Sequence, residues 1–245
     1  MQSPLEFDLV PGKKVLVSRR CVEIVGSWNP RGVWEGHWMQ RIAEYLRERP
    51  EDWTKGPLLL DVGANTASFC MIPALFNGLR SYAYEPNPVV ADMARENIAL
   101  NNLQDKVSLW PFAVGAENKD EVVLHVPIGP ETGLATLGDN VLRFDAKNAG
   151  TCVVTRMVTL DEHVGLDTPV AFIKIDTEGY ELFVLRGAEQ IIAKWKPGLL
   201  LEYNPVNAQQ CGVDLRDLDE LLQAWGYAVT CYDKENLFCE PVRVL

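Results

Sequence analysis

Apolar residues in this chain form short continuous runs that alternate with segments of helical periodicity from residue 58 onward. The run Leu58-Leu59-Leu60, followed by Val62, is apolar on both faces, as is typical of a strand in a parallel sheet that is covered on both sides. Strands are predicted at Leu58–Val62, Ser81–Tyr84, Val107–Trp110, Ala171–Ile175 and Gly198–Leu201. Strands that alternate with helices indicate an α/β fold with a doubly wound, mostly parallel sheet.

The helices between these strands are predicted from apolar side chains at helical spacing and from turn-forming residues at their ends. Asn87 and Pro88 supply a cap and a first-turn proline for one of them. The predicted helices are Val33–Arg49, Thr66–Phe76 with Pro73 inside it, Pro88–Leu100, Glu178–Trp195, and one that Asp214 caps and Gly226 stops.

Two β-rich segments complete the predicted architecture. Tyr227–Tyr232 and Leu237–Val244 are joined by a linker of hairpin length, which predicts an antiparallel C-terminal pair. Residues 117–157 contain further β-rich runs and are interpreted as an insertion that folds as a hairpin. We therefore predict one domain over residues 1–245, with an N-terminal cap and helix in residues 1–57 that includes one strand at Lys14–Val17.

Composition narrows the class of protein. With 245 residues, 47% of them hydrophobic, the chain can bury a sizeable core, which excludes a disordered protein. A net charge of −11 disfavours nucleic acid as a partner. The six cysteines form no C-x-x-C pair, so neither a zinc site nor a redox motif is expected. Without a run of membrane-spanning length or a signal-like N-terminus, the protein is expected in the cytoplasm and not in a membrane.

Acidic residues lie at the carboxyl ends of the predicted strands. They are Asp61, Glu85, Asp176 with Glu178, and Glu202. Ligands of open α/β sheets bind outside the carboxyl ends of the strands, so acids at four strand ends favour a ligand site over four separate helix caps. The turn Gly63–Ser68 lacks the second and third glycines of a dinucleotide fingerprint, and Asp61 would repel a pyrophosphate.

An acidic rim instead suits S-adenosylmethionine, which carries a sulfonium and an ammonium but no phosphate. Glu85, at the end of the second strand, is placed to accept hydrogen bonds from both ribose hydroxyls. Phe112–Gly115 either stacks on the adenine or belongs to the core. The cofactor-binding residues predicted are Asp61, Gly63, Ala64, Asn65, Glu85, Pro86, Asn87, Ala113 and Asp176.

Several segments together resemble the FkbM family of S-adenosylmethionine-dependent methyltransferases. They are Asp61–Asn65, Glu85–Asn87, Leu160–Glu162, Ile173–Glu181 and Leu185–Ala188, within a match from about Leu58 to Tyr203. The resemblance implies the seven-stranded class I methyltransferase fold and, commonly, O-methylation of small molecules such as polyketides and sugars. Two positions depart from the family pattern: Thr66–Phe69 replaces Ile-Gly and an aromatic, and Tyr180 replaces a frequent histidine.

Methyl transfer to an alcohol requires removal of its proton, which a carboxylate or an imidazole can perform. Asp176 and Glu178 are the first candidates for this base, although Glu178 also suits a helix N-terminus. Glu202 and Asn204 are candidates to orient the acceptor hydroxyl. The resemblance places His37, in the first helix, over the cofactor as a further base candidate.

A metal ion is the alternative use of the acids. Asp176 and Glu202 together suit magnesium, but the sequence offers no clear third ligand, so no metal is predicted. The loop Glu131–Thr136 is either a lid or surface. The leading hypothesis is O-methylation of a small metabolite; N-methylation of a peptide or an amine, and a non-catalytic cofactor-binding scaffold, are the alternatives. The oligomeric state is left open.

Overall fold

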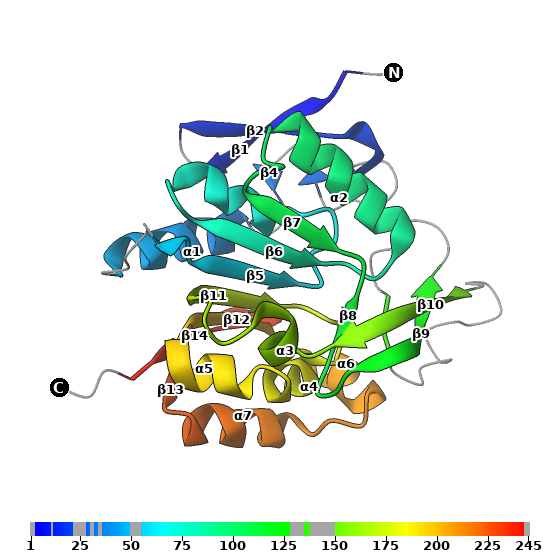
Figure 1. The fold of residues 1–245 in the computed structure, drawn as a ribbon, viewed down its shortest axis with the longest axis vertical. Helices are drawn as coiled ribbons and strands as arrows, with labels where there is room; N and C mark the ends of the chain where they lie inside the picture. The colour runs from blue at the N-terminus through cyan, green and yellow to red at the C-terminus, as the bar shows by residue number, and fades with distance from the viewer. Residues whose placement is uncertain are drawn as a thin grey trace.

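The computed structural model describes residues 3–10, 12–21, 28–29, 32–33, 36–49, 55–127, 135–137 and 150–242. Its centre is a seven-stranded sheet with the order β13-β14-β12-β11-β5-β6-β7 (Figure 1). The strands are β5 (Leu58–Val62), β6 (Arg80–Tyr84), β7 (Val107–Trp110), β11 (Val170–Ile175), β12 (Gly198–Glu202), β13 (Tyr227–Tyr232) and β14 (Asn236–Pro241).

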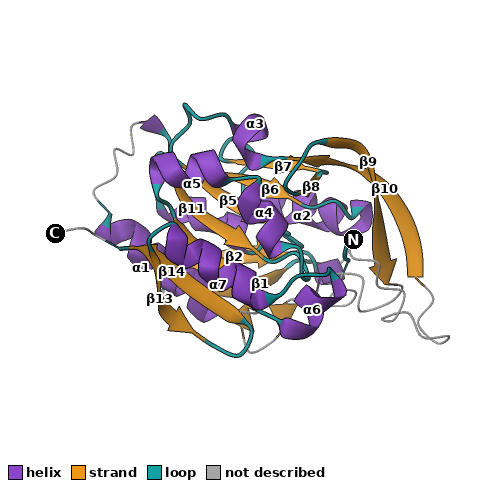
Figure 2. Ribbon diagram, turned by 90° about the horizontal axis from the view of Figure 1, so that it is seen from below, coloured by secondary structure: helices purple, strands orange, loops and turns teal. Residues whose placement is uncertain are grey.

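The first five of these strands in the chain are parallel, and β14 and β13 join the β12 edge antiparallel. This arrangement confirms the predicted doubly wound, mostly parallel seven-stranded sheet with an antiparallel C-terminal hairpin. The central strands β5 and β11 are buried at every position, because helices cover both faces of the sheet (Figure 2).

One face of the sheet is covered by α1 (Gly36–Glu48), the 3₁₀ helix η3 (Phe69–Leu75) and α2 (Pro88–Leu100). The other is covered by α3 (Leu160–Val164), α4 (Glu181–Arg186), α5 (Glu189–Trp195), α6 (Pro205–Gln210) and α7 (Leu215–Ala224). The helix α2 begins as predicted, with the Asn87 side chain accepting from Val89 N at 3.1 Å. Within the described ranges, every helix is too short or too polar to cross a bilayer.

The N-terminal segment contains more regular structure than predicted. The strand β1 (Leu5–Val10) pairs antiparallel with β2 (Lys13–Val17), where the sequence indicated one strand only. This hairpin is fixed to α2, because the Asn101 side chain exchanges two hydrogen bonds with the Leu16 backbone, at 2.8 and 2.7 Å. Two-residue strands β3 (Trp28–Asn29) and β4 (Gly32–Val33) precede α1.

Two predicted helices differ in the structure. The segment 66–76 forms the 3₁₀ helix η3 around Pro73, whose ring removes a backbone donor. The segment 178–195 forms α4 and α5 with a break at Gly187. A Cβ on Gly187 would lie 2.0 Å from Gly115 O, so the chain approaches another backbone too closely there for any other residue. Asp161 then caps α5 by accepting from Gln190 N and Ile191 N.

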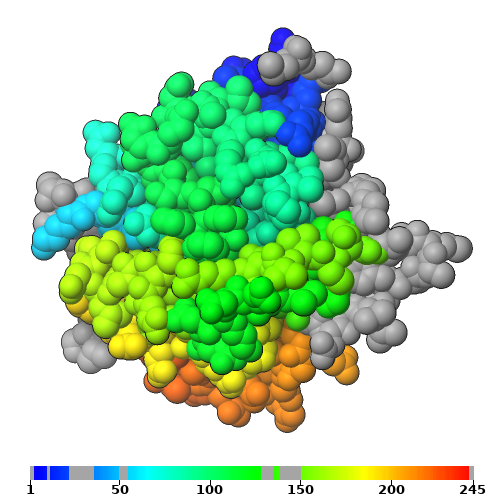
Figure 3. Space-filling model, turned by 45° about the vertical axis from the view of Figure 1, so that its right-hand side comes forward, coloured from blue at the N-terminus to red at the C-terminus, as the bar shows by residue number. Residues whose placement is uncertain are grey.

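Strands within residues 113–127 and 150–158 form a second, smaller sheet of order β8-β10-β9. Its strands are β8 (Ala113–Val114), β9 (Lys119–Pro127) and β10 (Gly150–Val158), and β9 pairs antiparallel with β10. On the surface, residues of this hairpin (green and lime) lie between the segment of about residues 55–110 and the C-terminal helices in yellow and orange (Figure 3). Most of the loop considered as a lid, residues 131–134, lies outside the described residues.

Candidate active site

The turn after β5 is shaped by a glycine that no other residue can replace. Gly63 has φ 71°, and a Cβ there would lie 1.8 Å from Asp176 O. The Gly63 and Ala64 amides donate to Tyr84 O at 3.0 and 2.9 Å, which ties the turn to the end of β6. Asn65 follows in the left-handed region at φ 50°. The turn therefore brings the carboxyl ends of three neighbouring strands into contact.

Glu85 lies beside this turn, where its two oxygens are oriented by two backbone amides. Oε2 accepts from Asn65 N at 2.9 Å, and Oε1 accepts from Asn87 N at 2.8 Å. Burial raises the pKa of Glu85 from 4.5 to about 7, although both amides act in the opposite direction. Each carboxylate oxygen retains a second lone pair, which suits the two hydroxyls of a ribose.

Asp61, the first residue of the turn motif, is fully buried in the structure. Its Oδ2 accepts from Cys70 Sγ at 3.1 Å, and its Oδ1 lies 3.4 Å from Lys174 Nζ. Burial raises the pKa of the Cys70 thiol, which therefore stays protonated and donates. The Asp61 carboxylate thus lies beneath the turn, in contact with the protein interior.

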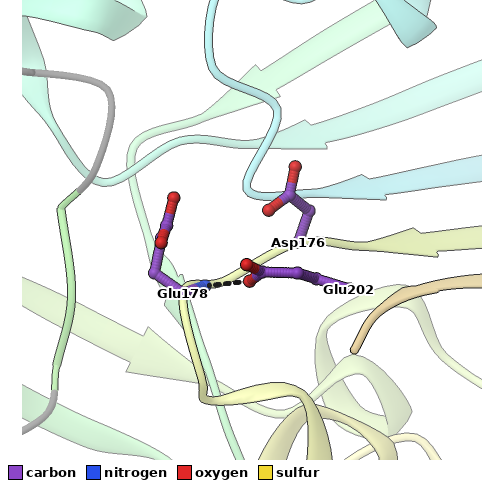
Figure 4. Close-up of side chains that lie close together, drawn as sticks. All are labelled: Asp176, Glu178 and Glu202. Carbon is purple, nitrogen blue, oxygen red and sulfur yellow. Dashed lines mark hydrogen bonds between the residues drawn. The ribbon is translucent and has the colours of Figure 1, made fainter. Parts of the chain in front are cut away.

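Three carboxylates converge where β11 and β12 end (Figure 4). Asp176, Glu178 and Glu202 each have an oxygen within 4.8 Å of the others. The Glu178 amide donates to Glu202 Oε2 at 3.1 Å. The amide nitrogen Nδ2 of Asn207 donates to Glu178 Oε2 at 2.8 Å and to Glu202 Oε1 at 2.7 Å. We call these three acids the carboxylate cluster.

Glu178 occupies an unusual backbone conformation in this cluster. Its φ is 56°, in the left-handed region that side chains with a Cβ rarely adopt, and it precedes α4 instead of beginning a helix. The conformation is fixed from both ends, because the Glu178 amide contacts Glu202 and Thr136 Oγ1 donates to Glu178 O at 3.2 Å. Glu181 fixes the same loop by accepting from Thr177 N and Gly179 N.

Charge is concentrated in the carboxylate cluster. Burial, followed by the charges of Asp176, Glu178 and Glu181, raises the pKa of Glu202 to about 10. Glu202 therefore holds a proton at neutral pH. Glu178 supplies the third carboxylate that the sequence did not offer for a metal ion. The Asn207 amide already donates hydrogen bonds to two of these carboxylates. A proton on Glu202 is therefore a simpler way than a metal ion to offset the repulsion among them.

The remaining predicted residues have structural contacts near the site. Asn204 caps α6 by accepting from Val206 N and Asn207 N, so it positions the helix that carries Asn207. His37 lies outside the carboxylate cluster, with Nε2 3.4 Å from Asp233 Oδ2. Asp233 is in the turn before β14, whose first residue pairs with Glu202, so His37 lies at the same edge of the sheet.

The segment after β7 belongs to an aromatic group in the structure. Phe112 lies 6.0 Å from Trp110 and 5.7 Å from His163, measured between ring centroids. His163 Nδ1 lies 2.9 Å from the Tyr84 hydroxyl, and burial lowers the pKa of His163, which favours the neutral ring. These contacts favour a core role for Phe112. Ala113, in β8, is buried.

The sequence analysis assigned no role to two side chains near the site. Lys174 is a lysine inside an otherwise apolar, fully buried strand, and that single charge was the available signal. Asn207 carried no signal, because only the cap at Asn204 and the packing of Gly179 against Asn207 O bring it to the carboxylates.

The residues at this edge fit S-adenosylmethionine. Among the described residues, Asn65 Oδ1 is buried and has no hydrogen-bond partner, so the turn contains an unused acceptor. Glu85 offers paired acceptors, and Asp176, with a side chain 35% exposed, offers a carboxylate to a cation. When bound, this cofactor supplies an electrophilic methyl group.

Comparisons with known proteins indicate the family of this chain. A family model described as "Methyltransferase FkbM domain" matches residues 61–229. A ribosomal protein L11 methyltransferase from Carboxydothermus hydrogenoformans is 33% identical over 67 residues, which are 27% of this chain and 22% of that protein.

Solved structures are similar at low sequence identity. An FkbM methyltransferase from Methylobacillus flagellatus KT is 18% identical with a TM-score of 0.49, over 80% of this chain and 50% of that one. The N-terminal domain of human METTL16 in complex with SAH is 14% identical with a TM-score of 0.43, over 82% and 66% of the two chains. The chain thus spans about half of the first structure it matches. Because the family model covers more than half of the sequence, the chain belongs to the FkbM family of S-adenosylmethionine-dependent methyltransferases.

Proposed function

We propose that this protein transfers the methyl group of S-adenosylmethionine to a hydroxyl of a small, polyketide- or sugar-like metabolite. The carboxylate cluster is the observation that supports this proposal most directly. It combines Glu202, whose pKa of about 10 keeps it protonated, with Glu178, which is held in a left-handed conformation next to it. A protonated acid beside a second carboxylate is an arrangement found in sites that move protons.

In this mechanism Glu178 is the general base. S-adenosylmethionine, when bound, would supply the methyl group and would leave as the neutral sulfide, while the Glu178 carboxylate would take the proton of the acceptor O–H. Protonated Glu202 serves as a hydrogen-bond donor in the cluster. The strain of a left-handed glutamate persists only where its surroundings fix it, as Thr136 and Glu202 do here.

Cofactor binding in this proposal uses the glycine turn, Glu85 and Asp176. Glu85 would accept from the ribose hydroxyls, and Asp176 would accept from the cofactor's ammonium. Gly63 allows the turn to approach Asp176, and Asn65 offers its unused side-chain oxygen. Pro86, Asn87, Ala64 and Ala113 are further cofactor contacts in this proposal.

An amine acceptor is the second candidate, and the negative charge of the carboxylate cluster favours it. A neutral amine attacks the methyl carbon without prior loss of a proton, so it needs less base than an alcohol. Carboxylates near the acceptor position would also concentrate ammonium-bearing substrates there. The two candidates differ in what they require of Glu178.

The test is methyl transfer to panels of hydroxylated and amine acceptors, followed as release of S-adenosylhomocysteine. With a hydroxyl acceptor, Glu178→Gln should lower kcat by about 100-fold or more, the usual contribution of a general base. Glu189→Gln, at an exposed helix position, is the matched control and should retain wild-type turnover.

Activity that survives in both Glu178→Gln and Asp176→Asn would favour the amine candidate. A larger loss in His37→Gln than in Glu178→Gln would transfer the base role to the His37–Asp233 pair. Tight cofactor binding with no turnover on either panel would indicate a non-catalytic scaffold.

A further inference from the structure

A buried lysine lies directly beneath the proposed cofactor site. Lys174 is in the central strand β11, between β5 and β12, and is 3% exposed. Its register partner on β5 is Asp61. An ammonium in such a place is unfavourable unless it is paired and hydrogen-bonded, so its contacts have to account for its presence.

Three oxygen atoms surround this ammonium. Lys174 Nζ donates to Gly63 O at 2.7 Å, lies 3.4 Å from Asp61 Oδ1, and lies 3.3 Å from Asp176 Oδ2. The ring of Phe69 lies on another side, with its centroid 5.4 Å from Nζ. The contact with Gly63 O is a hydrogen bond, whereas the two carboxylates form ion pairs with the ammonium. The side chain therefore links two neighbouring strand ends and the turn between them.

We propose that Lys174 is a positioning residue that sets the geometry of the cofactor site before the cofactor binds. It neutralises the buried carboxylate of Asp61 and fixes the carbonyl of Gly63, and with it the turn that carries Asn65. It also contacts Oδ2 of Asp176, which leaves Oδ1 for the ligand's ammonium. This inference rests on the cofactor site proposed above.

Such a role should appear in affinity, because a site that is already ordered loses less conformational freedom on binding. Without Lys174, the Gly63 carbonyl loses its side-chain donor and the Asp176 carboxylate is free to rotate. Both changes act on groups that face the cofactor, whereas Asp61 itself is fully buried. The effect should therefore follow the lysine and not its buried partner.

The experiment is calorimetric binding of S-adenosylhomocysteine to the full chain. Lys174→Met alone leaves Asp61 buried without its cation and can fail to fold, so the informative variant is Asp61→Asn/Lys174→Met, compared with Asp61→Asn. The matched control is Lys106→Met. Lys106 Nζ also donates to two backbone carbonyls, of Pro73 and Phe76 at 2.9 Å each, but it precedes β7 at the opposite end of the sheet.

We expect the double variant to bind about 10- to 100-fold more weakly than Asp61→Asn, the range for a lost hydrogen bond to a charged group. Lys106→Met should melt at a lower temperature and keep the wild-type dissociation constant, which separates positioning from general stability. A folded double variant that binds within about twofold of Asp61→Asn would overturn the role of Lys174. Wild-type protein that does not bind would overturn the cofactor site, and this inference with it.

Discussion

Protonation of Glu85 should link folding stability to cofactor binding. This carboxyl is buried and has a pKa raised from 4.5 to about 7. Since one pKa unit corresponds to about 1.36 kcal/mol, the shift of roughly 2.5 units corresponds to about 3 kcal/mol. The folded state retains the proton over a pH range in which the unfolded state has released it. The stability contributed by the raised pKa is therefore complete below about pH 4.5 and is lost as the pH rises through about 7.

The perturbation is Glu85→Gln, which keeps the shape of the protonated side chain and removes its titration. Urea unfolding of wild type and variant, without cofactor, should be compared at about pH 5 and about pH 8. The free energy of unfolding of the variant should increase by about 2.5 kcal/mol relative to wild type between these two pH values, because at about pH 5 the unfolded state has already begun to lose its proton. Other buried acids, such as Glu202, titrate in both proteins and cancel in the difference.

Binding of S-adenosylhomocysteine supplies the second half of this prediction. The ionised Glu85 is the better acceptor for ribose hydroxyls, so wild-type affinity should increase as the pH rises to about 7. The Glu85→Gln variant should bind more weakly and lose this pH dependence, whereas Glu189→Gln should retain it. A stability difference that is the same at both pH values would refute the assignment of the raised pKa to Glu85.

Three further predictions concern single side chains. Gly63→Ala places a Cβ 1.8 Å from Asp176 O at φ 71°, so urea unfolding should show a loss of about 2–5 kcal/mol, and a wild-type midpoint would contradict the geometry. Glu202→Gln mimics the protonated acid; because stability from a raised pKa is lost as the pH rises toward about 10, thermal melts should show its advantage over wild type growing between about pH 6 and pH 9. A constant difference would exclude this pKa. Asn87→Ala removes the cap of α2 and should cost about 1 kcal/mol in urea unfolding, so an unchanged midpoint would contradict the cap.

Local sequence signals predicted the strands and the helix start that carry this site. The apolar run at 58–62 and the buried strand that ends before Asp176 have the composition that a parallel sheet requires, and both form central strands. The pair Asn87-Pro88 carries its own capping chemistry, so the start of α2 needed no tertiary information. These signals succeed because they depend on neighbours within a few residues along the chain.

Other features depended on contacts that no local pattern contains. The helical periodicity of residues 178–195 is continuous, but Gly187 packs against the backbone of Gly115 and divides the segment into two helices. Tertiary contacts also place Glu178 in a loop with left-handed backbone instead of in a helix. In this loop Asn207 donates a hydrogen bond to it.

The sequence by itself determined the fold class, the family and the acidic character of the ligand edge, because strand composition, cap residues and motif spacing are local properties. Only the tertiary structure decided which charged groups of the site contact one another and which of them hold a proton. It buried Asp61 against Lys174, assembled Glu178 and Glu202 into one cluster, and gave Glu202 a pKa of about 10. The physical reason is that desolvation and Coulomb interactions depend on distances in space, and residues from separate strands come within a few ångströms only when the sheet has formed.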